Sequence, residues 1–159
     1  MGVLIENRQD RHKIEQKPLK KKAQAILDAL GSHDGELSIL LLDDPQIAVL
    51  NKNYLQREGP TNVIAFPMRE GVFAEINPDL LGDVVISLET AAKEGLAAEM
   101  SMENRLDELL IHGILHLFGY DHETSETEAG RMEAKSRELL KQLDSFPVYP
   151  GWVLYNVSR

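Results

Sequence analysis

The sequence predicts an α+β protein in which a small mixed β-sheet of about four strands is flanked by helices. Three observations support this fold class. A chain of 159 residues suits one compact domain with a single large core. Short apolar segments of β character are interspersed, without strict regularity, with longer segments of helical periodicity. No internal repeat or low-complexity tract divides the chain, so we predict one domain over residues 1–159.

The first strand and helix are predicted from the N-terminal 31 residues. Val3–Asn7 has the pattern of a short strand. A helix is expected over residues 18–30, because proline favours the first helical position and Gly31 can end it. The lysines at positions 20, 21 and 22 of this helix are expected to form a solvated face rather than an RNA-binding patch.

The next elements are bounded by clear start and stop signals. Glu36–Leu42 is a compact apolar run with β character. Asp44 and Pro45 then supply the N-cap and first residue of a helix through about Gln56. Asn62–Phe66 is predicted to be a strand that ends at a proline.

After a connection over residues 68–80, the chain returns to regular structure. Gly82-Asp83 is expected to form a turn into the β-branched strand Val84–Ile86. Ser87 and Ser101 can each cap a helix, to about Met100 and Phe118 respectively. A capping box at residues 125–128 opens a last helix to about Leu143. The aromatic tail, with Phe146, Tyr149, Trp152 and Tyr155, is expected to pack onto the body.

Composition restricts the possible functions. The chain has no cysteine, so any bound metal must have nitrogen and oxygen ligands. No stretch approaches the roughly 20 apolar residues of a membrane-spanning helix, and the N-terminal apolar run is too short for a signal peptide. We therefore expect a soluble cytoplasmic protein. The formal net charge of −9 argues mildly against tight nonspecific binding to nucleic acid, although a local basic patch can outweigh it.

Three of the five histidines lie within residues 112–122. His112 and His116 are one turn apart on one face of the predicted helix, and Gly119 allows the chain to turn so that His122 can return to the same ion. Three imidazoles leave a fourth tetrahedral position for water, which is typical of catalytic zinc. We predict one Zn²⁺ per chain, bound by these three histidines in a hydrolase. Metal-free surface histidines are the alternative, which we would favour for an isolated pair.

The spacing His-x-x-x-His-x-x-Gly-x-x-His is similar to that of metzincin proteases. Those enzymes carry a glutamate directly after the first histidine, where it acts as the general base. Here that position is Gly113, which cannot move a proton. A metallopeptidase-like hydrolase therefore remains only an alternative.

Three segments carry a family resemblance. His112–His122 matches a family signature nearly completely, Pro60–Pro67 resembles a second motif, and Leu81–Ser87 resembles a third. The matches run in order between about Glu36 and Leu143. The sequence thus resembles the YbeY-type ribosomal RNA maturation factors, which are bacterial single-strand-specific endoribonucleases.

The resemblance has consequences for both fold and function. It implies a zincin-like three-histidine zinc site on a small mixed sheet. It also implies processing of the 3′ end of 16S ribosomal RNA, ribosome quality control, and contact with ribosomal subunits in the cytoplasm. A ribosome assembly factor with a structural zinc site is a further alternative.

One basic position departs from the family pattern. Family members often carry an arginine after the tyrosine that precedes the second motif, whereas here Tyr54 is followed by Leu55. Arg57 matches a basic position two residues further on. We predict that Arg57 takes part in catalysis by binding phosphate, because a guanidinium matches phosphate geometry in two-pronged fashion. A solvated surface arginine is the alternative.

Other polar residues near these motifs are candidates for the site. Asp121 is predicted to act either as the base or, preferably, as a partner that orients an imidazole, and Glu123 can do the same. Thr61 and Asn62 are predicted substrate contacts at the cleft wall, with turn formation as their alternative role. The RNA 2′-hydroxyl also remains a possible nucleophile.

Overall fold

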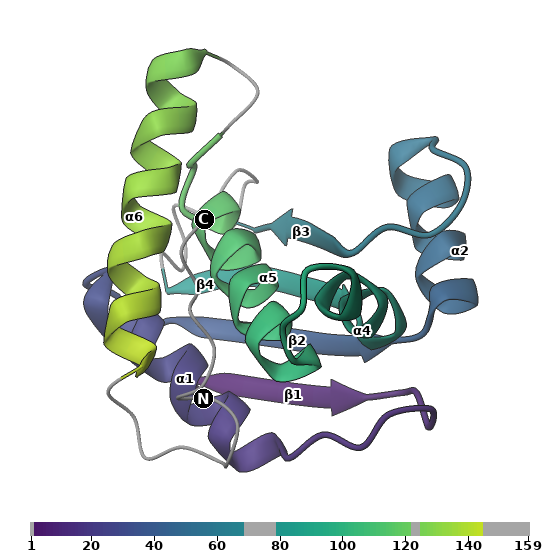
Figure 1. Cartoon of the computed structure of the whole chain (residues 1–159). Coiled ribbons are helices and arrows are strands. Elements are labelled where there is room, and N and C mark those ends of the chain that lie inside the picture. The colour runs from purple at the N-terminus through teal and green to yellow at the C-terminus, as the bar shows by residue number, and fades with distance from the viewer. Residues whose placement is uncertain (1, 69–78, 122–124, 145–159) are drawn as a thin grey trace.

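The computed structural model describes residues 2–68, 79–121 and 125–144 and confirms the α+β fold class with a four-stranded mixed sheet. Figure 1 shows helices on both faces of this sheet. The strands are β1 (Val3–Asn7), β2 (Glu36–Leu42), β3 (Val63–Pro67) and β4 (Leu80–Ser87). The helices of the described part are α1 (Gln16–Ala29), α2 (Asp44–Leu55), α4 (Leu88–Ala97), α5 (Met102–Leu117) and α6 (Glu126–Asp144).

The sheet has the strand order β1-β2-β4-β3. The first three of these strands are parallel, and β3 runs antiparallel to β4. Because β4 is inserted between β2 and β3, the strand that follows α2 in sequence lies at the edge of the sheet. α5 crosses the sheet face formed by β3 and β4 (Figure 1).

Two apolar clusters hold helices to opposite faces of the sheet. The larger cluster joins alternate strand residues, such as Ile39 and Val84, to α1, α4, α5 and α6. The smaller one lies on the other face, where Ile47 of α2 packs against Ile64 and Val85. This arrangement follows from the strand period of two, which sends successive side chains to opposite faces.

The predicted helix caps are largely confirmed. The hydroxyl oxygens of Ser87, Ser101 and Ser125 each accept a hydrogen bond from the backbone N–H three residues later, at 3.0–3.1 Å. The prediction for α2 was wrong by one residue, because Asp43 rather than Asp44 is the N-cap. Asp43 and Gln46 form a reciprocal capping box, with bonds of 2.9 and 3.0 Å.

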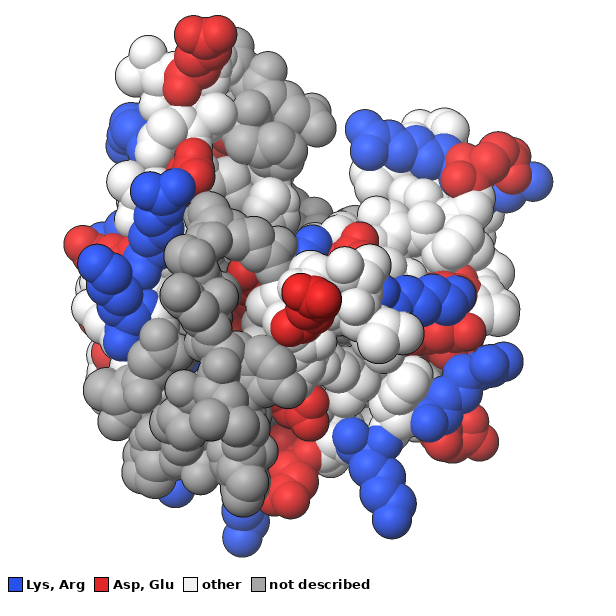
Figure 2. All heavy atoms as spheres, in the orientation of Figure 1, with Lys and Arg blue, Asp and Glu red and all other residues white. Residues whose placement is uncertain are grey.

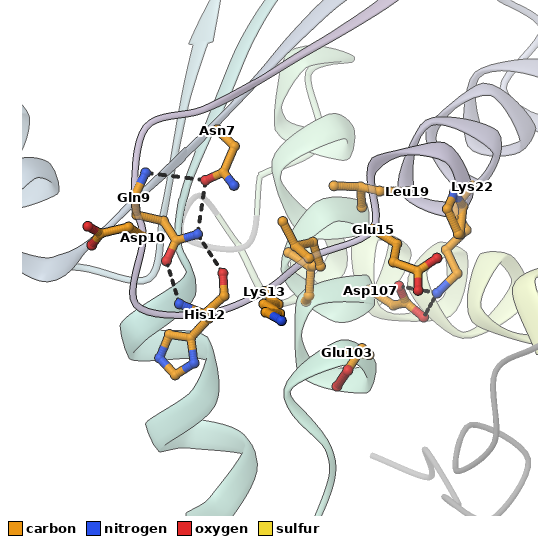
Figure 3. A pocket seen from close by; sticks show the side chains of 13 residues that line it. Asn7, Gln9, Asp10, His12, Lys13, Glu15, Leu19, Lys22, Glu103 and Asp107 are labelled. Atoms are coloured by element: carbon orange, nitrogen blue, oxygen red, sulfur yellow. Dashed lines mark hydrogen bonds and ion pairs between the residues drawn. The ribbon is translucent and has the colours of Figure 1, made fainter.

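The expectation of a fully solvated lysine face on α1 was wrong at one position. Lys20 and Lys21 are exposed, but Lys22 is buried. Figure 3 shows its ammonium group reaching Asp107 of α5 at one wall of a cavity of about 650 Å³. α1 therefore presents Lys22 to the core together with Ile26 and Leu27, while its other lysines face solvent.

Gly82 also differs from its prediction, because it lies within β4 rather than in a turn before a strand. It pairs with Leu37 and Pro67 and has a φ of +136°. A Cβ at this position would lie 2.2 Å from the carbonyl oxygen of Phe66. Only glycine permits β3 and β4 to approach so closely here.

Within the described ranges, no helix has both the length and the apolar character needed to cross a membrane. The predicted packing of the aromatic tail concerns residues 145–159, which lie outside the described residues.

Candidate active-site cleft

The candidate site is built around two histidines near the C-terminal end of α5. Leu106, Leu110 and Ile114 of this helix are buried, whereas His112 and His116 are only half-buried. The Nε2 atoms of the two histidines lie 3.0 Å apart, and their ring planes make an angle of 74°. The histidine face of α5 is therefore distinct from its core face.

The separation of this pair can be compared with that of two ligands on one zinc ion. Two imidazole nitrogens on a tetrahedral zinc ion are about 3.4 Å apart, given zinc–nitrogen bonds of about 2.1 Å. The negative end of the α5 dipole also favours a cation beside His116, which lies in the last turn. His112 and His116 are thus chemically suited to bind zinc, although their 3.0 Å separation is that of a direct hydrogen bond between the rings and would have to widen by about 0.4 Å around the ion.

The third predicted ligand, His122, lies in the segment 122–124, outside the described residues. Within ranges 2–68, 79–121 and 125–144, no three His, Cys, Asp or Glu side chains are grouped so that they could hold a metal. The three-histidine site therefore stays a prediction. The two histidines that received no metal assignment, His12 and His33, lie elsewhere, and His33 is exposed and bonded to Asp28 at 2.7 Å.

A cleft of about 640 Å³ brings most of the predicted site residues together. It lies along β3 and the end of α5. Arg57, Asn62, Asp121 and the two histidines all line it. The remaining lining residues are Leu55, Val63, Ile64, Ala65, Pro67, Gly113, Gly119 and Tyr120. Thr61 is half-buried beside this group but is not among the lining residues.

Arg57 is placed so that its side chain lines the cleft. It is exposed, and it is the only lysine or arginine among the described residues that line the cleft. Its side chain makes no ion pair with any residue in the described ranges, so the guanidinium remains available to an anion. Leu55, at the position where the family often has arginine, is also exposed and lines the same cleft.

The close packing around Gly113 leaves no room for a glutamate after the first histidine. This residue faces the sheet, and a Cβ there would lie 2.6 Å from Val84 Cγ1 and 3.2 Å from Val63 Cγ2. A larger side chain would push α5 away from β3 and β4. The helix therefore approaches the sheet at the point where a metzincin would carry its general base.

The outer edge of β3 adds backbone groups to the cleft wall. Ser87 N donates to Asn62 O, and Ile64 pairs with Val85, so even-numbered residues of this strand bond to β4. In an antiparallel pair, alternate residues direct their N–H and C=O groups away from the partner. Val63 and Ala65 therefore direct theirs toward the outer edge, which has no neighbouring strand in the described part of the chain.

A polar network behind the cleft was not predicted. Asn62 Nδ2 lies 3.3 Å from both carboxylate oxygens of Glu94 on α4. Glu94 also accepts a hydrogen bond of 3.0 Å from Arg105 Nε, and Arg105 Nη1 donates to Glu108 at 2.7 Å. The three-residue spacing of Arg105 and Glu108 suggests their pairing on one helix, but nothing in the sequence connects Asn62 to Glu94, 32 residues away.

Charge on the visible surface is mixed rather than segregated. On the face in Figure 2, described acidic and basic side chains are interspersed over α2, α4 and α6. No broad basic surface appears among the described residues of that face. This agrees with the acidic net charge of the chain.

Comparisons with known proteins connect this site to a family. The chain matches the sequence profile described as Endoribonuclease YbeY over residues 4–144. It is 51% identical to the Endoribonuclease YbeY of Geobacter sulfurreducens over 146 residues, which cover 91% of this chain and 97% of that protein. The Aquifex aeolicus Endoribonuclease YbeY is 40% identical over 129 residues, 81% of each protein.

A solved structure supports the fold. The solution structure of a Thermotoga maritima protein superposes with a TM-score of 0.63 at 22% identity, covering 89% of both chains. The profile match extends from within β1 to the end of α6 and includes every described residue of the cleft. This chain belongs to the endoribonuclease YbeY family.

Proposed function

We propose that this chain is a zinc-dependent, single-strand-specific endoribonuclease that processes ribosomal RNA. Family membership supports the hydrolysis of RNA phosphodiester bonds. The observation that carries the proposal is the convergence of the His112 and His116 Nε2 atoms at a cleft that also contains Arg57. A metal-dependent RNA hydrolase uses both features, because the metal site must lie next to a group that binds phosphate.

The histidines have the role of metal ligands. In the proposal, His112, His116 and His122 hold one zinc ion per chain. When bound, zinc supplies Lewis-acid polarisation of the phosphodiester and lowers the pKa of a water molecule toward neutrality. The imidazoles must be neutral to bind the ion, so metal content should fall in acid.

The remaining predicted site residues act on the substrate. Arg57 donates to phosphoryl oxygens and stabilises the negative charge that grows on them during cleavage. Asp121 either accepts the proton released by the nucleophile or fixes the orientation of an imidazole. Thr61 and Asn62 contact the RNA chain where it enters along β3.

The cellular role follows from the same family assignment. We propose that the substrate is ribosomal RNA, including the 3′ end of 16S ribosomal RNA, and that the protein contacts ribosomal subunits in the cytoplasm. We also propose a contribution to ribosome quality control, in which the protein leaves the RNA of defective ribosomal subunits unprocessed.

The test separates three functions in one experiment. Protein purified without a nickel column is analysed for metal and then incubated with single-stranded RNA and with casein, with and without a chelator. Chelator-sensitive RNA cleavage supports the proposal, casein cleavage supports a metallopeptidase, and stoichiometric zinc with neither activity supports an assembly factor.

The variant His116→Ala guards this test against contaminating nucleases. It should lose bound zinc and RNA cleavage together. The matched control is His33→Ala, which removes an exposed imidazole outside the cleft and should keep both. Full cleavage and stoichiometric zinc in His116→Ala would overturn the site assignment.

A further inference from the structure

Asn62 lies where two cavities meet. One is the cleft with the histidine pair, and the other is a cavity of about 440 Å³ between α5 and α6. Asn62, Val63 and His112 line both cavities. A side chain at this junction can contact a chain-like substrate that extends from one cavity into the other.

The surrounding residues determine which end of the Asn62 amide faces the cavities. A carboxylate accepts hydrogen bonds and cannot donate them, so Glu94 attracts the amide NH₂ and repels the amide oxygen. The distances of 3.3 Å from Nδ2 to both Glu94 oxygens agree with this orientation. Reversing the amide would place its oxygen against the carboxylate, and both hydrogen bonds would be lost.

Arg105 in turn holds the Glu94 carboxylate in place, through a hydrogen bond of 3.0 Å donated by its Nε. Its side chain is only 21% exposed. Burial lowers its pKa, but the hydrogen bonds that it donates to Glu108 and Glu94 outweigh this and raise the pKa above the usual value. Arg105 thus remains a cation that bridges the two carboxylates. The network joins the start of β3 to α4 and α5, so the amide orientation is built into the packing of three elements.

The consequence is a hydrogen-bond acceptor at the junction of the cavities. No residue in the described ranges donates a hydrogen bond to Asn62 Oδ1. An acceptor disfavours contact with phosphate oxygens and favours a donor on the ligand. In an RNA strand the donor that occurs at every nucleotide, whatever the base, is the ribose 2′-hydroxyl, which DNA lacks.

We propose that Asn62 is a specificity-determining residue that accepts a hydrogen bond from a 2′-hydroxyl of the bound RNA, and that Glu94 and Arg105 are positioning residues that orient its amide. This inference rests on the proposed ribonuclease function and extends it by explaining how the cleft distinguishes RNA from DNA. Arg57 and the histidine pair would act on the scissile phosphate, while Asn62 recognises the sugar of a neighbouring nucleotide.

The experiment is a scan of single 2′-deoxy substitutions in a short RNA. Each oligonucleotide carries one substitution near the mapped cleavage site, and the ribose that could supply its own 2′-hydroxyl as nucleophile is left unchanged. For the wild-type protein, kcat/KM should fall about threefold to tenfold at one position, the range expected for loss of one hydrogen bond. At the other positions it should stay within twofold.

Three variants test whether Asn62 contacts the 2′-hydroxyl at the sensitive position of the RNA. In Asn62→Ala, the penalty at the sensitive position should disappear while the fully ribose substrate is cleaved more slowly. In Glu94→Gln, either end of the Asn62 amide can face position 94, so the penalty should shrink although cleavage continues. Glu99→Gln makes the same change of charge on an exposed residue just after α4, and it should keep the wild-type penalty.

The results of the scan and of the variants either support or overturn the proposed role of Asn62. A wild-type scan without a sensitive position would overturn it, as would a full penalty in Asn62→Ala or a Glu94→Gln profile identical to that of Glu99→Gln. If Asn62→Ala does not cleave, the comparison of the two glutamate variants still decides. Failure of the proposed function gives a different result, since the wild-type protein would then cleave no RNA at all.

Discussion

Lys22 Nζ lies 2.6 Å from both carboxylate oxygens of Asp107, and this ion pair joins α1 to α5 within the core. The two side chains are only 2% and 9% exposed. Charges removed from water in this way are stable only while each has its partner, because an unpaired buried charge keeps the full cost of desolvation. The helix that carries the histidine pair is therefore tied to the N-terminal helix by charge as well as by apolar packing.

Replacing Lys22 alone should be much more harmful than replacing both partners. Lys22→Met removes the ammonium partner of a buried carboxylate and should lower the free energy of unfolding by about 3–5 kcal/mol. The double variant Lys22→Met/Asp107→Leu should recover most of this loss. Urea denaturation of both variants measures the difference, and equal losses would show that the charge of Asp107 is not what makes the single variant unstable.

Two helical glycines should respond in opposite ways to the same substitution. Gly113→Ala places a methyl group 2.6 Å from Val84 Cγ1 and should destabilise the protein by about 1–3 kcal/mol. Gly130→Ala on α6 meets nothing within 4 Å and should stabilise it by up to about 1 kcal/mol, through helix propensity alone. Thermal unfolding of both variants tests this. A stabilised Gly113→Ala would mean that α5 can withdraw from the sheet freely.

Asp44 should give the protein a stability that depends on pH. Burial alone would raise the pKa of this carboxyl, but hydrogen bonds from Ser87, Thr90 and Lys93 outweigh it and lower the pKa below 3.8. A lowered pKa in the folded state means that ionised Asp44 stabilises the fold above pH 3.8. This contribution is lost as the pH falls through the folded-state pKa.

The variant Asp44→Asn tests that dependence. It should be less stable than the wild-type protein by about 1–2 kcal/mol at pH 7, because hydrogen bonds to a charged acceptor become bonds to a neutral one. The difference should shrink steadily below pH 3.8 in denaturant titrations. Asp34→Asn, which changes an exposed carboxyl, serves as the control. A difference that stays constant down to pH 2 would contradict the assignment.

The features predicted from sequence are those that depend on neighbours in the chain. The serine caps and the limits of β1 and β2 follow from local patterns, and so does the pairing of His112 with His116 one turn apart. The error at the start of α2 is of the same local kind, because two adjacent aspartates can each cap a helix. Asp43 takes that role, and Asp44 turns to α4 instead.

The features missed are those made by contacts across the fold. Lys22 looks like its exposed neighbours on α1 because its partner, Asp107, lies 85 residues later. Glu94 looks like an ordinary helix carboxylate because its contact with Asn62 appears only when the fold brings α4 to the residue that precedes β3. Arg57 was placed at the site through the family motif, since composition and periodicity contain no signal for its position in the cleft.

Arg57 should be the cleft residue whose contribution to RNA binding depends most strongly on salt. For single-stranded nucleic acid, each phosphate neutralised by the protein adds about −0.7 to the slope of log affinity against log salt concentration. With chelator-treated protein, which allows binding without cleavage, Arg57→Ala should make this slope shallower by about 0.7. The kcat/KM of the zinc-loaded variant should fall by about tenfold to a hundredfold, with unchanged metal content.

Leu55 provides the complementary change, because its side chain is exposed in the same cleft. Leu55→Arg restores a cation at the position where the family often has one, and it should steepen the slope by about 0.7. In the double variant with Arg57→Ala, it should recover part of the lost activity if the cleft needs a guanidinium rather than this particular residue. Lys52→Ala removes an exposed cation of α2 outside the cleft, so its slope and rate should stay close to those of the wild-type protein. If Arg57→Ala matched Lys52→Ala in both measurements, Arg57 would be an ordinary surface charge, and the phosphate-binding role would have to belong to another group.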